Sequence, residues 1–421
     1  MMRRTAVINA RVFDAPRGVL IEAGSVVIEG ETVVEVTSEP RDFADAQIID
    51  AAGRVVLPGL IDAHVHVTAV SHDLLRLAAQ PPSLITAQSK GVMEGMLQRG
   101  FTTVRDACGA DFGLQEAVER GLFAGPRLFI AGWPITQTGG HADPRPKGAR
   151  EMFCTCAGLG LYGAIADGVG EVRRAVREQV RNGANQIKVM AGGGIASPTD
   201  PIDGTQYSME ELRAICEEAR AANLYVMAHA YSPQAVMRAV QAGVRSIEHG
   251  NLIDEASAKL LKQEGVWLVP TLATYAALAD EGQRLGWSAA MLEKLARVRA
   301  KGIESIHLAK AHGVAIALGT DLLGAMHQRQ SEEFSLRAAA LSPVEIVQSA
   351  TISAARLMDQ EGRIGSLARG AWADLLIVDG DPTRDVGVLS RPEVSLRLVM
   401  KAGKVVRNTL PTPAARTLSV P

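Results

Sequence analysis

The chain has 421 residues, of which 47% are hydrophobic, and its 44 Lys and Arg nearly balance its 46 Asp and Glu, for a formal net charge of −2. This composition allows a large buried core and contains no basic block of the kind that binds nucleic acid, so we expect no nucleic-acid partner. The sequence lacks an apolar run of about 18 residues, the length that spans a membrane, and lacks an apolar signal segment after its N-terminal arginines. We therefore expect a cytoplasmic protein with no membrane contact.

Both ends of the chain have the pattern of short β-strands. Apolar and polar residues alternate in residues 1–57 and again in the last part of the chain, with Gly, Pro and Asp between the runs. Because the intervening residues follow a different pattern, we predict one small β-sandwich domain built from both termini, residues 1–57 and 356–421. Residues 58–355 would then form a second domain inserted into the first.

The middle of the chain alternates short apolar runs with amphipathic segments of helical period, such as GEVRRAVREQVRNG and SMEELRAICEEARAAN. Strand–helix alternation of this kind predicts an α/β fold, specifically a parallel (β/α)₈ TIM barrel. The eight predicted strands are 60–67, 102–107, 127–132, 186–191, 224–229, 246–250, 266–271 and 315–321. A Gly- and Pro-rich loop at 192–206 follows the fourth strand, where a barrel places the lid of its active site.

Histidines are the first candidates for chemistry. His64 and His66 are two apart in a predicted strand and so face the same side, where two neutral imidazoles can bind one metal ion. For an isolated His-x-His pair, two separately hydrogen-bonded core histidines are the more common explanation. The other strands favour the metal site, because His229, His249 and Asp321 also stand at strand ends, where barrels place their catalytic groups.

Lys188 lies inside the fourth predicted strand, between two apolar residues. Burial of an ammonium is costly and lowers its pKa, so a neutral amine could form there. Such an amine can react with carbon dioxide to give an anionic carbamate that bridges two cations. A lysine that reaches out to solvent at the barrel mouth is the alternative, and for Lys188 taken on its own this alternative is the favoured explanation.

Several motifs together resemble the amidohydrolase superfamily over essentially the whole chain. They are PGLIDAHVH at 58–66, GFTTVRDACG at 100–109, IEHG at 247–250, LGTD at 318–321 and ADLLIVDGDP at 373–382. IKVMAGGGIASPTD at 187–200 resembles a narrower branch, which contains Xaa-Pro and related dipeptidases, carboxypeptidase-like enzymes and ochratoxin-hydrolysing amidases. In that branch the corresponding lysine is carboxylated.

The resemblance implies a set of ligands for two divalent metal ions, with zinc favoured by imidazole and carboxylate ligands and manganese, cobalt or iron not excluded. The first ion would be bound by three residues and the second by two, with carboxylated Lys188 and a hydroxide between them. The residues are His64, His66 and Asp321 for the first ion and His229 and His249 for the second.

Three further side chains are weaker candidates. His141, in TGGHAD, is either a donor to the substrate or a surface-loop histidine, and the resemblance favours the first. Tyr231 could contact the substrate or pack in the core, and the sequence favours neither. His327 could line the pocket, but a loop residue without a role there is the favoured explanation. Arg105 and Asp106, at the end of the second strand, suggest a buried structural ion pair.

By resemblance, the expected activity is hydrolysis of the amide or peptide bond of dipeptides or N-acyl amino acids. A metal-bridging hydroxide would attack, while Asp321 takes its proton and passes it to the leaving amine. The alternatives are hydrolysis of a carbamate, urea, lactone or cyclic amide at the same site, or a non-catalytic barrel that serves as a scaffold. All the expected ligand positions are filled, which disfavours the scaffold. We also expect a homo-oligomer.

Overall fold

The computed structural model describes residues 4–39, 42–43, 45–145, 148, 161–197, 200–282, 284 and 286–411, and the protein is an α/β protein in this part of the chain. The end of the predicted second segment of the β domain, 412–421, and residues 198–199 of the predicted lid lie outside the described residues. No described helix is both long enough and apolar enough to cross a membrane.

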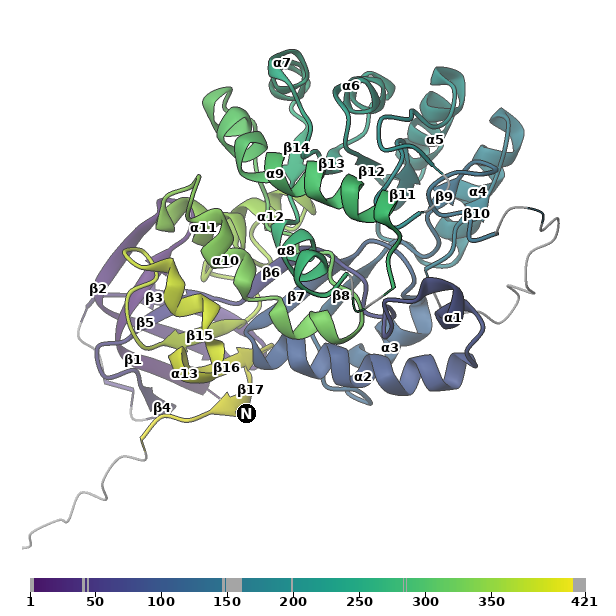
Figure 1. The fold of residues 1–421 in the computed structure, drawn as a ribbon. Helices are drawn as coiled ribbons and strands as arrows, with labels where there is room; N and C mark the ends of the chain where they lie inside the picture. The colour runs from purple at the N-terminus through teal and green to yellow at the C-terminus, as the bar shows by residue number, and fades with distance from the viewer. Residues whose placement is uncertain are drawn as a thin grey trace, which may run out of the picture.

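Strands from both termini form one sheet, which lies at one side of the molecule (Figure 1). The sheet has eight strands in the order β17-β16-β15-β5-β1-β2-β3, with β4 paired to β1. The bounds are β1 Arg4–Asp14, β2 Val19–Glu29, β3 Thr32–Thr37, β4 Gln47–Asp50, β5 Val55–Pro58, β15 Leu375–Val378, β16 Leu396–Lys401 and β17 Lys404–Asn408. The strands predicted at both ends of the chain are thus present, and they pair with each other. Their division into two sandwich layers stays a prediction.

Two all-parallel sheets occupy the middle of the chain, one of three strands in the order β6-β7-β8 and one of six in the order β10-β9-β11-β12-β13-β14. Every residue of β11, β12 and β13 is buried, as expected for parallel strands that are covered on both faces. The bounds are β6 Leu60–Val65, β7 Phe101–Asp106, β8 Arg127–Ile130, β9 Ile135–Thr136, β10 Ala164–Ile165, β11 Ile187–Met190, β12 Val226–Ala230, β13 Ser246–His249 and β14 Trp267–Val269.

The predicted strand at 315–321 is largely wrong, because only Ile316 forms a strand-like bridge, to Leu268. The segment is still hydrogen-bonded on both sides. The Ala317 amide donates to the Leu268 carbonyl at 3.1 Å, and the Ala63 amide of β6 donates to the Leu318 carbonyl at 2.8 Å. The prediction also missed β9 and β10, two-residue strands in a stretch interrupted by proline and glycine.

Helices separate the parallel strands, and α4 to α7 lie along the outer side of β11–β14 (Figure 1). The amphipathic segments predicted from sequence are α4 and α5, and α5 begins with a capping box in which Ser208 and Glu211 bond each other's backbone amides. The bounds are α1 Leu74–Ala78, α2 Pro82–Gln98, α3 Phe112–Glu119, α4 Val169–Arg181, α5 Met209–Ala221, α6 Pro233–Ala242, α7 Glu255–Gln263, α8 Leu272–Glu281, α9 Ala289–Ala311, η1 Gly324–Arg329, α10 Glu332–Arg337, α11 Pro343–Ser349, α12 Ile352–Leu357, η2 Val386–Ser390 and α13 Pro392–Ser395.

Candidate metal centre

A cavity lies at the carboxyl ends of the parallel strands. All eight side chains proposed from sequence as ligands or catalytic groups line it. They are His64, His66, His141, Lys188, His229, Tyr231, His249 and Asp321. His327 does not line it; this histidine is buried in η1 and its Nε2 bonds to the Ala69 carbonyl at 3.1 Å.

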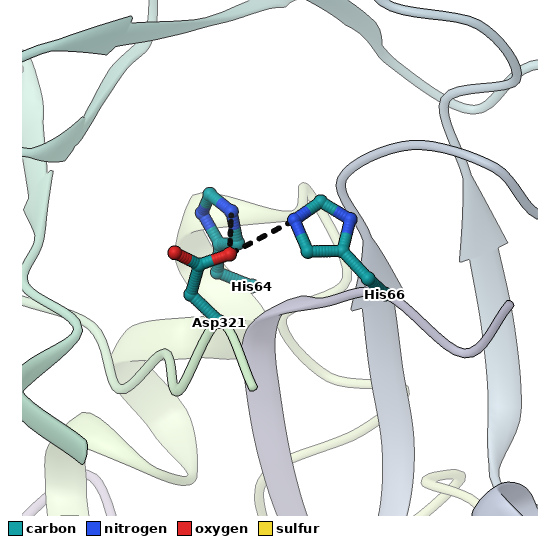
Figure 2. Close-up of side chains that lie close together, drawn as sticks. All are labelled: His64, His66 and Asp321. Atoms are coloured by element: carbon teal, nitrogen blue, oxygen red, sulfur yellow. Dashed lines mark ion pairs between the residues drawn. The ribbon is translucent and has the colours of Figure 1, made fainter. Parts of the chain in front are cut away.

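His64, His66 and Asp321 form a compact group whose ligand atoms all lie within 4.8 Å of one another (Figure 2). Asp321 Oδ1 is 2.9 Å from His66 Nε2 and 3.5 Å from His64 Nε2. Burial raises the pKa of Asp321, but the two imidazoles outweigh burial and hold that pKa well below its usual range. Asp321 has a φ of +56° and His249 a φ of +75°, a costly conformation for residues with a Cβ and one that is frequent at functional sites.

Each of four histidines is fixed through one ring nitrogen, which leaves the other nitrogen available as a ligand. His64 Nε2 is buried and makes no hydrogen bond within the part of the chain that the structure describes; the nearby Asp321 oxygen is 3.5 Å away, and a cation between the two atoms would satisfy both. A fixed imidazole next to a carboxylate is the usual donor set for zinc and similar ions. The anchoring bonds run from His64 Nδ1 to Glu248 Oε2 (2.6 Å), His66 Nδ1 to the Cys108 carbonyl (3.2 Å), His229 Nε2 to the Gly193 carbonyl (3.2 Å) and His249 Nδ1 to Thr271 Oγ1 (2.9 Å).

Burial also keeps His229 and His249 neutral. Desolvation is the largest cause that lowers the pKa of each well below its usual value, and for His249 it outweighs the opposing effect of Asp321. Lys188, which is 1% exposed in β11, has a lowered pKa for the same main reason. A neutral imidazole is the form that binds a metal ion, and a lowered pKa brings the Lys188 amine closer to the neutral form that reacts with carbon dioxide.

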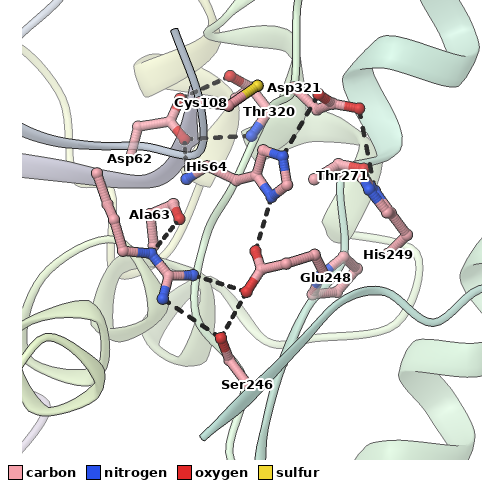
Figure 3. A network of polar contacts seen from close by, with 12 residues as sticks. Asp62, Ala63, His64, Cys108, Ser246, Glu248, His249, Thr271, Thr320 and Asp321 are labelled. Carbon is pink, nitrogen blue, oxygen red and sulfur yellow. Dashed lines mark hydrogen bonds and ion pairs between the residues drawn. The ribbon is translucent and has the colours of Figure 1, made fainter. Parts of the chain in front are cut away.

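His64 is held by Glu248, which belongs to a buried ion pair (Figure 3). Glu248 Oε1 accepts a bond from Arg105 Nη2 at 2.9 Å and its other oxygen accepts the bond from His64, and both Glu248 and Arg105 are 0% exposed. Burial raises the pKa of Glu248, but Arg105 and His64 outweigh that effect and the pKa lies far below its usual range. The carboxylate is therefore charged and fixes the ring of His64.

The expected pairing of Arg105 with Asp106 is wrong, because the two side chains point to opposite faces of β7 and Arg105 pairs with Glu248. Asp106 instead accepts the backbone amides of Val67 and Ala110, and burial raises its pKa to about 6.

Asp62 holds the backbone that carries Asp321. Its carboxylate accepts the Thr320 hydroxyl at 2.6 Å and the Gln330 amide at 2.9 Å, and the amides of His64 and Thr320 also donate to it. Asp62 and Glu248 were not predicted as functional residues from sequence. Both are buried, follow an apolar residue directly, and lie inside the motifs PGLIDAHVH and IEHG. A carboxylate in an otherwise apolar strand was the available signal.

His141 and Tyr231 each stack on the ring of one candidate ligand. The His141 ring stacks on His229 with centroids 4.3 Å apart, and its Nδ1 is 3.2 Å from Asp200 Oδ2. The Tyr231 ring stacks on His249 at 5.1 Å, and its hydroxyl accepts a bond from the Tyr275 hydroxyl at 3.1 Å. Since Tyr231 accepts from Tyr275, its own O–H is available to a bound molecule.

The remaining cavity wall is mostly apolar. It is contributed by α1, the loop after β11, the end of α8 and the segments next to them: Leu74, Leu161, Ile195, Leu278, Trp287 and Leu323. Polar ligands at one end and apolar groups along the sides are typical of a small-molecule site.

Comparison with known proteins agrees with this geometry. Residues 55–406 match the Amidohydrolase family. Ochratoxinase from Aspergillus niger is 32% identical over 424 residues, which cover 96% of this chain and 87% of that protein. A solved structure of a prolidase complexed with N-methylphosphonate-L-proline is 49% identical with a TM-score of 0.94, covering 96% of this chain and 100% of that one. A structure of a Xaa-Pro dipeptidase with bound methionine is 28% identical with a TM-score of 0.87, covering 96% and 100%.

The match covers most of the chain and includes every strand that carries a candidate ligand. The protein therefore belongs to the amidohydrolase family and is a hydrolase that acts on carbon–nitrogen bonds.

Proposed function

We propose that the protein is a binuclear metal-dependent hydrolase that cleaves the amide or peptide bond of dipeptides or N-acyl amino acids. The observation that carries the proposal is the set of four histidines, each fixed through one ring nitrogen, around a cavity that also contains Lys188 and Asp321. Independent packing of histidines in a core would not bring four histidines, each fixed through one ring nitrogen, to the wall of one cavity.

In this proposal His64, His66 and Asp321 hold one divalent ion and His229 and His249 hold the other, with Lys188 carboxylated by carbon dioxide between them. Zinc suits these ligands best. When bound, the ions supply a water of lowered pKa and polarise the scissile carbonyl.

The protein's own groups then position the substrate and move the proton. Asp321 accepts the proton of the attacking water and returns it to the nitrogen of the leaving amine. His141 and Tyr231 lie on the substrate side of the histidines, where they can donate to the carbonyl oxygen or to the carboxylate of the substrate.

The substrate class rests on two kinds of support. The similar proteins include a prolidase, a Xaa-Pro dipeptidase and ochratoxinase. The apolar wall of the cavity suits a substrate with an apolar side chain or acyl group.

A library of dipeptides and N-acyl amino acids, assayed with the metal-loaded enzyme, tests the proposal. We expect hydrolysis of several members, fastest for those with an apolar side chain. The same assay includes carbamates, ureas, lactones and cyclic amides. Turnover confined to those compounds would replace the proposed substrate class by another bond at the same site.

We also propose how the parallel strands and the termini divide the chain. The two parallel sheets would close into one (β/α)₈ barrel over residues 58–355. Residues 315–318 would take the place of the eighth strand, between β14 and β6. The Asn185 amide, just before β11, donates to the Ile130 carbonyl of β8 at 2.7 Å and supports closure on the other side. Residues 1–57 and 356–421 would form the separate β-sandwich domain.

A further inference from the structure

A lysine on α9 holds the loop that follows β11. The Nζ atom of Lys294 lies 3.3 Å from the Gly194 carbonyl oxygen, 3.1 Å from that of Ser197 and 2.5 Å from that of Asp200. An ammonium group has three N–H donors, so one side chain can satisfy all three carbonyls. The side chain is half-buried, and its contacts join three described residues of the loop to α9.

The same loop reaches the cavity at several points. The Gly193 carbonyl accepts the bond from His229, and Ile195 and Ala196 line the cavity. The Gly194 amide donates to Asp200 Oδ2 at 2.8 Å. The His141 ring lies directly against Gly194, where a Cβ would come within 1.8 Å of His141 Cε1, so only glycine leaves room for the ring.

Asp200 fixes the orientation of His141. It is 5% exposed, and its Oδ2 accepts bonds from His141 Nδ1 at 3.2 Å and from Gln206 Nε2 at 3.4 Å. Gln206 in turn accepts the His141 backbone amide at 3.1 Å. With Nδ1 engaged and the ring stacked on His229, Nε2 is the atom of His141 that remains to contact a bound molecule.

We propose that Lys294 and Asp200 are positioning residues for the reaction: Asp200 orients His141, and Lys294 holds Asp200 and the rest of the loop in place. The inference rests on the proposed function for the role of His141 as a donor to the substrate. Neither residue contacts a candidate ligand directly, and the loop reaches one only through the bond between the Gly193 carbonyl and His229. We therefore expect their loss to affect the chemical step and to leave the metal content unchanged.

Arg297 provides a matched control for a merely structural role. It lies one turn further along α9 and forms a two-bond ion pair with Asp203, at 2.7 and 2.8 Å, in the same loop. This pair is about half exposed, and nothing in it touches His141. Arg297→Met therefore weakens the attachment of the loop to α9 without disturbing the Asp200–His141 contact.

The test compares Lys294→Met, Asp200→Asn and Arg297→Met, each alone and combined with His141→Ala, in the full-length metal-loaded enzyme. We expect Lys294→Met and Asp200→Asn to lower kcat about tenfold to a hundredfold, the cost of misplacing a catalytic group by a fraction of its contact distance, with unchanged metal content and little change in KM. We expect Arg297→Met to stay within about twofold of the parent, as for an exposed ion pair. In the His141→Ala background neither Lys294→Met nor Asp200→Asn should cause a further loss. Further loss in that background, an equal effect of Arg297→Met, or loss of metal would overturn the inference.

A second readout separates this inference from the proposed function. The hydrogen-bonded ring N–H proton of His141, assigned in the NMR spectrum by its absence in His141→Ala, should be lost or shifted in Asp200→Asn and Lys294→Met and retained in Arg297→Met. If these shifts occur while no amide in the library is hydrolysed, the proposed function fails and the positioning role stands. If amides are hydrolysed and the proton is unaffected by Lys294→Met, the positioning role fails.

Discussion

The floor and the rim of the cavity are built in different ways. The floor carries the candidate ligands on β6, β11, β12 and β13, at His66 just after β6, and at Asp321. Its supporting groups, such as Glu248 and Arg105, are completely buried. The rim carries His141 on a loop. Asp200 of the loop after β11 contacts His141, and Lys294 on α9 holds that second loop through contacts that are partly open to solvent. Strands fix positions more rigidly than loops do, so the floor suits chemistry shared by many substrates and the rim suits selection among them.

The comparison predicts that changes which remove a ligand of the floor, or the group that anchors it, cost metal and turnover together, whereas changes in the rim alter turnover or substrate preference alone. A floor substitution that keeps a ligand oxygen should cost turnover and spare the metal. Substitutions at four positions test this difference.

Lys188→Ala should have the largest effect. Without the bridging group, we expect loss of activity below detection and of much of the bound metal, measured by elemental analysis and amide hydrolysis. Short carboxylic acids added to this variant should restore part of both, because a carboxylate can replace a carbamate, whereas a short amine of similar size should restore neither. An unmodified and uncoordinated Lys188 amine in a metal-replete crystal structure would contradict the assignment.

Asp321→Asn should come next. The amide keeps the size of the side chain and one oxygen but cannot accept the proton, so we expect most of the metal to remain and turnover to fall by about 10²–10⁴-fold. Substrates with good leaving groups should lose less, because their amines need less protonation on departure. Near parental turnover of a simple amide by metal-replete Asp321→Asn would assign proton transfer to another group, with His141 as the next candidate.

Glu248→Gln should affect metal binding and stability together. It removes the charge that faces buried Arg105, which typically costs about 3–5 kcal/mol of folding free energy, and it weakens the anchor of His64, which typically costs about 10–100-fold in metal affinity or activity. Denaturant unfolding and a chelator competition measure the two effects.

Glu333→Gln is the matched control for that variant. Glu333 and Arg337 form another ion pair with 0% exposure, and neither lines the cavity. We expect Glu333→Gln to lower stability and leave metal affinity unchanged. Equal loss of metal affinity in both variants would show that Glu248 acts only through general stability.

Trp287→Ala should have the smallest effect. Because Trp287 belongs to the apolar wall, its removal should raise KM a few-fold for substrates with large apolar groups and leave small substrates and metal content unaffected. The loss of one apolar contact in a pocket is worth roughly 10–200-fold at most in discrimination. Phe112→Ala serves as a control, because Phe112 is 57% exposed and does not line the cavity. An equal rise in KM for all substrates would show that Trp287 does not select among them.

The sequence predicted the floor better than the rim. Buried parallel strands appear as short apolar runs, and a His or Asp at the end of such a run marks its carboxyl end, so the candidate ligands could be found without a structure. The strand predicted at 315–321 was wrong because the chain leaves the strand conformation: Asp321 has a positive φ, and the amides of Thr320 and Asp321 both donate to the His64 carbonyl.

The partners of the ligands could not be predicted, because they come from remote parts of the chain. Arg105 and Glu248 are 143 residues apart, and Lys294 is 94 residues from Asp200. Periodicity and local spacing carry no information about such pairs. The same reason explains why the expected Arg105–Asp106 pair was wrong: neighbours in a strand face opposite sides, whereas the true partner lies on another strand.

The central claim is that the floor binds two divalent ions and that hydrolysis needs both. The most direct test removes the metal with a chelator, adds zinc in steps, and follows the bound metal per chain together with hydrolysis of an amide substrate from the library. The account predicts saturation at two ions per chain, with full activity reached only when the second is bound. Full activity with one ion, or in the metal-free protein, would contradict it.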